Sequence, residues 1–227
     1  SPTITNCTIE GNTANWGGGI FCWYNSEPTI TDCTISGNAA VNGDGGGMSN
    51  AYGSHTTVSN CTFRHNGCGR DGGGMACVGA HDPDVPSNAT IESCVFEDNH
   101  ADDRGGGFFA RASEPTLLDS VLSQNTAPVG GGAAFFESEA TYVSGNVFCA
   151  NDVAGVWGEF VDGGDNVFAD ECGDDCAGDV NGDGMVSVDD VLLVLADFGG
   201  AGAGDANGDG IVDVNDLLLV IAAWGAC

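Results

Sequence analysis

The chain has 227 residues, of which 33 are acidic and only four are basic, and its net charge is -29 at pH 7. This balance excludes nucleic acid and anionic membrane surfaces as partners, because phosphate binding needs cationic patches. No apolar run reaches the roughly 18–20 residues that span a bilayer, so we expect no membrane insertion.

Glycine and cysteine usage narrows the class of fold. Thirty-eight glycines and an aromatic content of 8% argue against a core of large side chains. The eleven cysteines are an odd number, so at least one thiol is unpaired unless two chains are linked. The acidity favours divalent cations as ligands, although adaptation to a salty or calcium-rich medium would leave the same composition.

A repeated phrase organises the first and longer part of the chain. It reads PTITNCTIEGN at residues 2–12 and is followed by three glycines at residues 17–19. Its last asparagine recurs, at a nearly constant interval, as Asn12, Asn38, Asn66, Asn99, Asn125 and Asn151. A regular period of this length is typical of stacked supersecondary units, none of which can bury its apolar face alone.

Each repeat predicts three short strands. A Thr-Ile pair such as Thr3-Ile4 begins the first, and Cys7 and Ile9 then share one face in a period of two. The asparagine follows in a bend, and the glycine triplet allows positive φ or close approach of backbones. A third strand follows, as at residues 20–22. The pattern predicts a mostly β fold, a parallel β-helix of about six coils spaced about 4.8 Å apart.

Stacked coils place equivalent residues in columns. The six asparagines should form an internal ladder, and Cys7, Cys33, Cys61 and Cys94 a buried column. We favour reduced thiols acting as small hydrophobes there, because parallel Cβ vectors oppose the dihedral of a disulfide. Elsewhere Cys172 could pair with Cys176, and Cys68 with Cys77 in the irregular third coil.

The Cys-Thr-Ile-x-x-Asn and Gly-Gly-Gly phrases resemble the right-handed parallel β-helix repeat families, namely the pectate-lyase-like fold and the polymorphic outer-membrane adhesin repeats. The resemblance covers residues 2–168. It implies the fold, but these families include polysaccharide lyases, adhesins and structural surface proteins, so it does not decide the activity.

Composition changes after residue 169, and two similar loops follow. We place the boundary between a β-helix at 1–171 and a calcium-binding module at 172–227. Oxygen donors at loop positions 1, 3, 5, 9 and 12, glycine at 6 and a carbonyl at 7 match an EF-type calcium loop. The predicted ligands of two Ca²⁺ ions are Asp179, Asn181, Asp183, Met185, Ser187 and Asp190 in the first loop, and Asp205, Asn207, Asp209, Ile211, Asp213 and Asp216 in the second.

Each loop leads into an apolar helix, at residues 191–195 and 217–221. Five consecutive apolar residues leave no polar face, so we expect both helices to be buried. Two such units in tandem resemble a type I dockerin over residues 178–224. That resemblance implies a cohesin partner bound through the helices, although the recognition positions at residues 188–189 and 214–215 lack the Ser-Thr pair common in cellulosomal members. A calcium-dependent cap for the β-helix is the alternative.

We expect no enzyme and no catalytic residue. All four arginines and all four histidines fall between residues 55 and 111, and solvated turn positions are the favoured interpretation. A polysaccharide lyase is the alternative, and it requires a groove where arginine and aspartate converge across coils three and four. Its candidate residues are Arg64, Arg70, Arg104 and Arg111, beside calcium held by Asp98, Asp102 or Asp103.

The remaining expectations concern partners. Ser1 opens directly into a repeat, so either the natural chain begins upstream or another molecule stacks on the first coil. The second option predicts head-to-tail self-association. Cys227 could attach the chain to a surface, and Asn6, Asn60 and Asn88 in Asn-x-Thr sequences could carry glycans. We therefore predict an extracellular or cell-surface calcium-binding structural protein that forms filaments or is anchored; the alternative is a carbohydrate-active β-helix joined to cohesin.

Overall fold

The computed structural model describes residues 1–79, 86–137, 140–152, 155–169, 172, 178–181, 185–200, 202, 204–207, 210–223 and 225–226. The chain divides into two compact units, residues 1–170 and 171–227. We call them the β-helix unit and the C-terminal unit.

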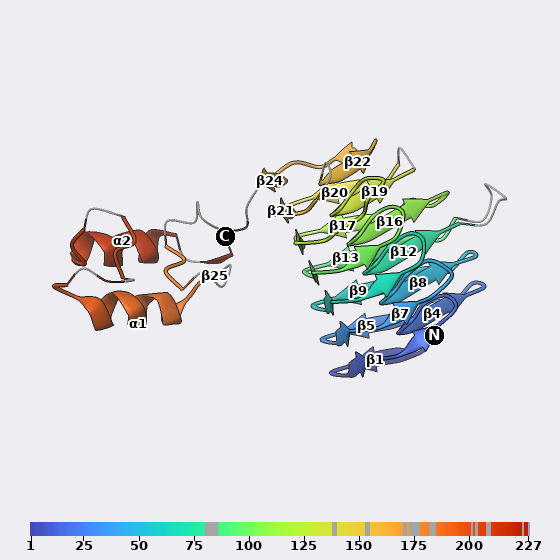
Figure 1. Ribbon diagram of the computed structural model, residues 1–227, viewed down its shortest axis with the longest axis horizontal. Helices are drawn as coiled ribbons and strands as arrows, with labels where there is room; N and C mark the ends of the chain where they lie inside the picture. Colours follow the sequence, from blue (N-terminus) through green and yellow to red (C-terminus); the bar gives the residue numbers. More distant parts are fainter. Residues whose placement is uncertain are drawn as a thin grey trace. The chain divides into compact units, whose positions relative to one another are not determined.

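The β-helix unit is a parallel β-helix of about six turns, as predicted, and its strands stack in coil order (Figure 1). Two of its sheets have seven strands each. Sheet A runs in the order β1 (Thr3–Thr5), β5 (Thr29–Thr31), β9 (Thr56–Ser59), β13 (Ala89–Glu92), β17 (Thr116–Leu118), β20 (Tyr142–Ser144), β23 (Val161–Asp162). Sheet B runs in the order β2 (Thr8–Glu10), β6 (Thr34–Ser36), β10 (Thr62–Arg64), β14 (Val95–Glu97), β18 (Val121–Ser123), β21 (Val147–Cys149), β24 (Val167–Ala169).

Two further sheets complete the coil. Sheet C pairs the short strands β3 (Thr13–Ala14), β7 (Ala39–Ala40), β11 (Gly67–Cys68) and β15 (His100–Ala101). Sheet D, formed after the glycines, pairs β4 (Ile20–Trp23), β8 (Met48–Ala51), β12 (Met75–Val78), β16 (Phe108–Arg111), β19 (Ala134–Phe136) and β22 (Val156–Gly158). The prediction of three strands per coil therefore missed sheet C, because such short strands cannot show a period of two.

Inward-facing side chains of equivalent strands build the core. Phe63 and Phe96 of sheet B are fully buried and stack with ring centroids 4.8 Å apart and an angle of 5° between their planes. Their partners in adjoining coils are Ile35 and Leu122, also fully buried. The period of two in the sequence thus assigns the buried face correctly in these strands.

The six repeat asparagines form the predicted ladder. The amide nitrogen of each of the first five donates to the Oδ1 of the asparagine one coil further, at 3.0–3.1 Å, so that the ladder runs from Asn12 to Asn151. Backbone N–H groups donate to the same oxygens, and Asn66 Nδ2 also donates to the carbonyl of Ile35 at 2.9 Å. Each buried asparagine therefore satisfies backbone groups of the coil before it.

The cysteine column is a second polar ladder. The N–H of Cys7 donates to Cys33 Sγ and that of Cys33 to Cys61 Sγ, both at 3.4 Å, while that of Cys94 donates to Ser120 Oγ at 3.0 Å. The thiols are free and, except for exposed Cys7, buried. Hydrogen bonding, rather than hydrophobic packing alone, places these thiols in the turn.

The structure also bears on the two predicted cysteine pairs, Cys68 with Cys77 and Cys172 with Cys176. Cys68 and Cys77 are both free thiols, so the predicted staple of the third coil is wrong. Cys68 lies in sheet C within a small alanine-lined cluster, whereas Cys77 lies in the main core under sheet D. Cys149 and Cys172 are each disulfide-bonded, and Cys176 lies outside the described residues.

The C-terminal unit contains two helices, α1 (Val188–Asp197) and α2 (Val214–Ala222), and an antiparallel pair of strands, β25 (Met185–Val186) with β26 (Gly225–Ala226). Val186, Val194, Val212 and Val220 form its core. No helix among the described residues is long and apolar enough to cross a bilayer.

The expectation that both helices are buried is wrong. Leu192 and Leu195 of α1 are 55% and 50% exposed, and Leu218 and Ile221 of α2 are 58% and 52% exposed. Each helix buries one stripe against the other, so a run of five apolar residues within the C-terminal unit also faces outward.

Candidate metal centre

The first loop of the C-terminal unit is organised around the carboxylate of Asp190. This side chain is fully buried, and its Oδ1 accepts the N–H of Asn181 at 3.0 Å. Its Oδ2 accepts the N–H of Ser187 at 2.8 Å, and the Ser187 hydroxyl lies 3.3 Å from the same oxygen. Ser187 in turn caps α1 by accepting the N–H of Asp189. Predicted ligand positions 3, 9 and 12 are thus joined by hydrogen bonds at the start of a helix.

The second loop repeats this arrangement at the equivalent positions. Fully buried Asp216 accepts the N–H of Asn207 at 3.0 Å and that of Asp213 at 2.8 Å, and Asp213 caps α2. Gly210, at loop position 6, has a φ of +90°, as the sharp bend of an EF-type loop requires. Its N–H donates to Asp205 Oδ2 at 2.8 Å, so position 1 also turns inward.

The remaining predicted ligands are placed unevenly. Asp179 and Asp205 at position 1 are half-buried, and Ile211, which would offer its carbonyl, has an exposed side chain. Met185 begins β25, and Asp183 and Asp209 lie outside the described residues. Among the described residues, no three His, Cys, Asp or Glu side chains form a metal-sized group.

Hydrogen bonds keep the two buried carboxylates ionised. The N–H of Asp213 is the main cause that lowers the pKa of Asp216, against an opposing effect of burial. For Asp190, burial is the largest influence and acts to raise the pKa, but the N–H groups of Ser187 and Asn181 and further backbone donors together lower it. Ionised carboxylates with amide and hydroxyl oxygens nearby are a donor set that fits Ca²⁺.

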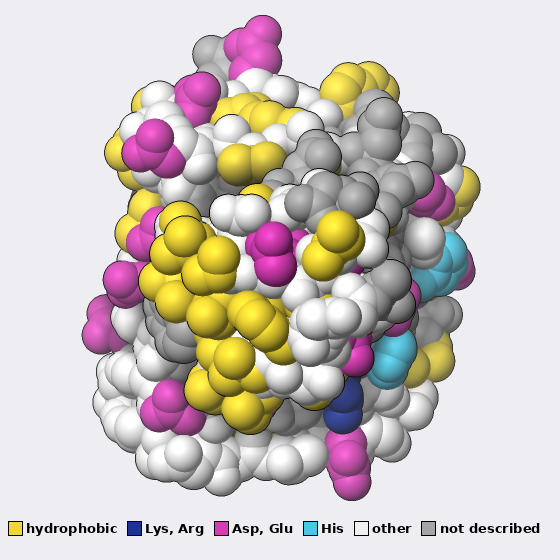
Figure 2. Space-filling model, turned by 90° about the vertical axis from the view of Figure 1, so that its left-hand side faces the viewer, with side chains coloured by type: hydrophobic (Ala, Val, Ile, Leu, Met, Phe, Trp, Pro, Cys, Tyr) yellow, Lys and Arg dark blue, Asp and Glu magenta, His cyan; other side chains and the backbone are white. Residues whose placement is uncertain are grey.

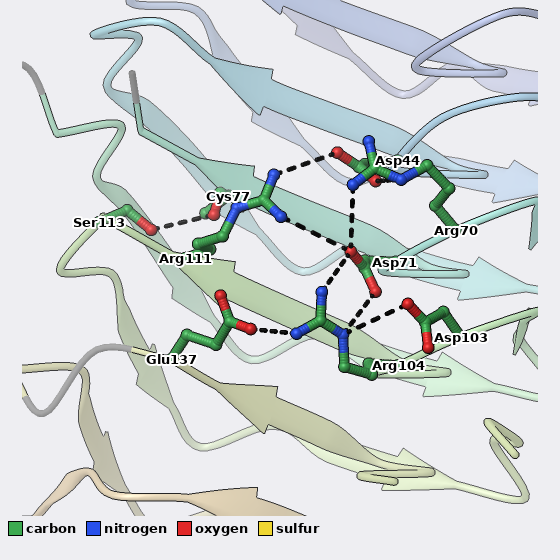
Figure 3. Close-up of polar contacts among 9 residues, drawn as sticks. All are labelled: Asp44, Arg70, Asp71, Cys77, Asp103, Arg104, Arg111, Ser113 and Glu137. Carbon is green, nitrogen blue, oxygen red and sulfur yellow. Dashed lines mark hydrogen bonds and ion pairs between the residues drawn. The ribbon is translucent and has the colours of Figure 1, made fainter. Parts of the chain in front are cut away.

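A second polar cluster lies beside sheet D in the β-helix unit (Figure 3). Fully buried Asp71 receives two hydrogen bonds of 3.0 Å from Arg104 and lies 3.9 Å from Arg111. Buried Asp44 lies 3.8 Å from Arg70 and 3.9 Å from Arg111. We call these five residues the ion network.

Aromatic rings pack against two arginines of the ion network. The Arg104 guanidinium lies 5.1 Å from the ring centroids of both Phe109 and Phe135, and it also contacts Glu137. Burial raises the pKa of Asp71, and the hydrogen bonds from Arg104 oppose that rise. The guanidinium groups are therefore occupied by carboxylates and rings, as in a structural cross-link between coils.

The lyase alternative predicted part of this cluster. Arg70, Arg104 and Arg111 do converge, but on Asp44 and Asp71, which the sequence reasoning missed, and exposed Arg64 is not part of it. The predicted calcium ligands are dispersed: Asp98 pairs with His65, Asp102 with His100 and Asp103 with Arg104.

A signal for the ion network was present in the repeat. Asp44, Asp71 and Arg104 each directly precede a glycine triplet, and Asp71 and Arg104 are bridged in register. Opposite charges at one repeat position predict an ion pair between coils. Two hollows in the described part of the solenoid lie at its first and last coils, lined by residues such as Ile4 and Phe148.

Comparison with known proteins agrees with the fold of the β-helix unit. The family model described as "Right handed beta helix region" matches residues 1–101. No curated protein and no solved structure shows significant similarity to the chain.

Proposed function

We propose that this protein is a non-enzymatic, calcium-binding β-helix protein whose C-terminal unit is a dockerin-like module that holds two Ca²⁺ ions and docks onto a cohesin-type partner. The observation that carries the proposal is the repeated loop geometry. In both loops a fully buried aspartate at position 12 accepts the N–H groups of positions 3 and 9, at the same distances of 3.0 and 2.8 Å. Two separate stretches of chain thus adopt the same hydrogen-bonded loop geometry.

The ligands of each ion follow from this geometry and the sequence. Carboxylate, amide and hydroxyl oxygens of positions 1, 3, 5, 9 and 12, with the carbonyl of position 7, would surround each Ca²⁺. The ion supplies a positive charge that joins both ends of the loop. Because positions 9 and 12 are also the N-cap and the third residue of a helix, the ion would orient α1 and α2.

The docking surface is the exposed apolar face of the two helices. Figure 2, which faces the C-terminal unit, shows hydrophobic side chains gathered in a patch. We define the docking face as six residues that occupy equivalent positions in the two helices and are each at least half exposed: Val188, Leu192, Leu195, Val214, Leu218 and Ile221. Exposed apolar patches of this kind are typical of protein interaction sites. The same face could instead cap the β-helix unit, and the cohesin-binding experiment described in the Discussion distinguishes the two.

A calcium titration of the full chain by calorimetry tests the metal sites. We expect two ions for the wild type and one for either Asp190→Asn or Asp216→Asn, because each change removes a ligand charge from one loop. Asp189→Asn is the matched control, since Asp189 is the exposed neighbour of Asp190 in the same helical turn. Helical circular dichroism without calcium should be equal in all variants. Unchanged stoichiometry in both loop variants would refute the proposal.

The ion network supports the non-enzymatic part of the proposal. Arg104 and Arg111 are engaged by buried Asp71 and by the ring of Phe109, an arrangement that suits a structural cross-link between coils. An extracellular or cell-surface location is part of this proposal because loops with aspartate at position 12 suit calcium-rich surroundings. Head-to-tail association stays a prediction, and sedimentation velocity of calcium-loaded protein over a concentration series checks it.

A further inference from the structure

Four thiols lie one above another along the turn between sheets A and B. Cys7, Cys33, Cys61 and Cys94 directly precede β2, β6, β10 and β14, whose residues pair in parallel register. All four are free thiols. Hydrogen bonding alone does not require cysteine at these positions, because Ser120 and Asn146 accept the equivalent N–H groups further along the column.

The geometry of the column opposes disulfides. Neighbouring strands lie about 4.8 Å apart, and stacked side chains point in the same direction. A disulfide needs sulfurs about 2.05 Å apart, with Cβ atoms closer than this spacing and a dihedral near 90°. Parallel side chains meet neither condition without movement of the backbone.

The same spacing fits a metal ion between two sulfurs. A metal–thiolate bond of about 2.3 Å places two sulfurs on opposite sides of an ion about 4.6 Å apart. Thiolates select soft ions such as Cu(I). Zinc requires four ligands, and the described residues bring no third His, Cys, Asp or Glu to such a site.

Cys61 and Cys94 are neighbouring thiols of the column that interact directly with each other. The Cys94 thiol hydrogen-bonds to Cys61 and, against the effect of burial, lowers the pKa of Cys61 to about 7, whereas the pKa of Cys94 is raised. Each sulfur also lies 3.2–3.3 Å from the carbonyl two residues before it. The hydrogen bond from Cys94 therefore favours the thiolate form of Cys61, the form that binds a metal ion.

We propose that the thiol column binds a soft, two-coordinate cation of the Cu(I) class between neighbouring sulfurs, with Cys61 and Cys94 as the first pair. One Cu(I) ion and two thiols give one bis-thiolate complex and two protons, which go to solvent. No electron is transferred. This inference does not rest on the calcium sites, because a hard ion with oxygen ligands and a soft ion with sulfur ligands occupy different units.

A competition titration tests it. Reduced full-length protein is titrated anaerobically with Cu(I) against a Cu(I) chelator, and thiolate-to-Cu(I) absorption and released protons are recorded. At a pH below the pKa of Cys61, where both thiols are protonated, the double variant Cys61→Ser/Cys94→Ser should bind one ion fewer than the wild type and release two protons fewer. Serine is a suitable replacement because Ser120 already accepts the N–H of Cys94 in this column.

The matched control is Cys68→Ser, which removes a buried free thiol outside the column. It should keep the wild-type stoichiometry, and melting curves of the metal-free variants establish that all are folded. A wild type that does not compete with the chelator would overturn the proposal, as would a double variant with unchanged stoichiometry. If the double variant unfolds, the single variants Cys61→Ser and Cys94→Ser take its place. Each should melt at the wild-type temperature and bind one ion fewer than the wild type.

Discussion

Single side chains determine whether neighbouring coils stay in register. The asparagine ladder and the cysteine–serine ladder both place a hydrogen-bond acceptor where a turn would otherwise leave a buried N–H without a partner. The Asn66 side chain makes four hydrogen bonds, three to backbone and side-chain groups of the coil before it and one to the Asn99 side chain of the coil after it. Residues that look like a consensus motif in the sequence therefore each satisfy several polar groups at once.

Asn66→Ala tests the asparagine ladder. The change leaves the N–H of Asn38 and the carbonyl of Ile35 without their partners, so we expect the free energy of unfolding to fall by about 2–4 kcal/mol. Urea denaturation measures it. The control is Asn42→Ala, which removes an exposed Asn–Asn hydrogen bond of 3.0 Å and should cost less than about 0.5 kcal/mol. Equal effects of the two changes would mean that burial in the ladder adds nothing.

The pKa of Cys61 gives a pH dependence. Because hydrogen bonding from Cys94 lowers it from 9.0 to about 7, the folded state holds the thiolate more readily than the unfolded state. This contribution is fully present above pH 9 and is lost as the pH falls to about 7. We expect ultraviolet thiolate absorption that titrates near pH 7 in the wild type and is absent in Cys61→Ser. Absorption that first rises near pH 9 would contradict this assignment.

At the scale of strands and helices, the sequence predicted the units that repeat often. The period of two and the recurring asparagine gave the strands of sheets A and B, because every coil repeats the same buried pair. Sheet C was missed because two residues such as Ala39-Ala40 carry no periodic signal. The exposed faces of α1 and α2 were missed because an apolar run does not show which side of a helix finds a partner.

The ion network should matter for the stacking of coils. Arg104→Gln removes both hydrogen bonds to buried Asp71, and we expect a loss of about 3 kcal/mol in the free energy of unfolding. Chemical denaturation of Arg64→Gln, which changes an exposed arginine on β10, serves as the comparison and should show almost no effect. If the free energy of unfolding falls by a similar small amount in both variants, Arg70 and Arg111 are sufficient to compensate the buried charge of Asp71.

The docking face gives a prediction for α1 and α2. Leu192→Asp/Leu218→Asp should weaken binding to a purified type I cohesin domain at least about tenfold, because burying each leucine contributes about 1.5–3 kcal/mol. Surface plasmon resonance with and without a calcium chelator measures it, and Arg64→Gln, which changes an exposed residue of the β-helix unit, is the control. Calcium stoichiometry should not change. If the double variant binds cohesin as tightly as the wild type, the docking face is wrong. If the wild type does not bind cohesin and the double variant melts at a lower temperature, the face instead caps the β-helix unit.

At the scale of the whole molecule, the chain contains two units that are stabilised by different interactions. The β-helix unit is held by ladders and stacked apolar residues that need no ion, whereas the C-terminal unit has a small valine core and two loops rich in carboxylates. The positions of the candidate metal loops could be named from the sequence because the spacing of EF-type ligands is local. Asp44 and Asp71 were not predicted because their arginine partners lie mostly in other coils, at positions distant in the sequence.

Native mass spectrometry of the intact chain tests the central claim most directly, because it counts the ions that each folded molecule holds. In millimolar calcium the account predicts a dominant species with two Ca²⁺ ions, and a dominant species with one ion for Asp190→Asn and for Asp216→Asn. Wild-type protein that carries no specifically bound calcium under these conditions, or two ions in both variants, would contradict it.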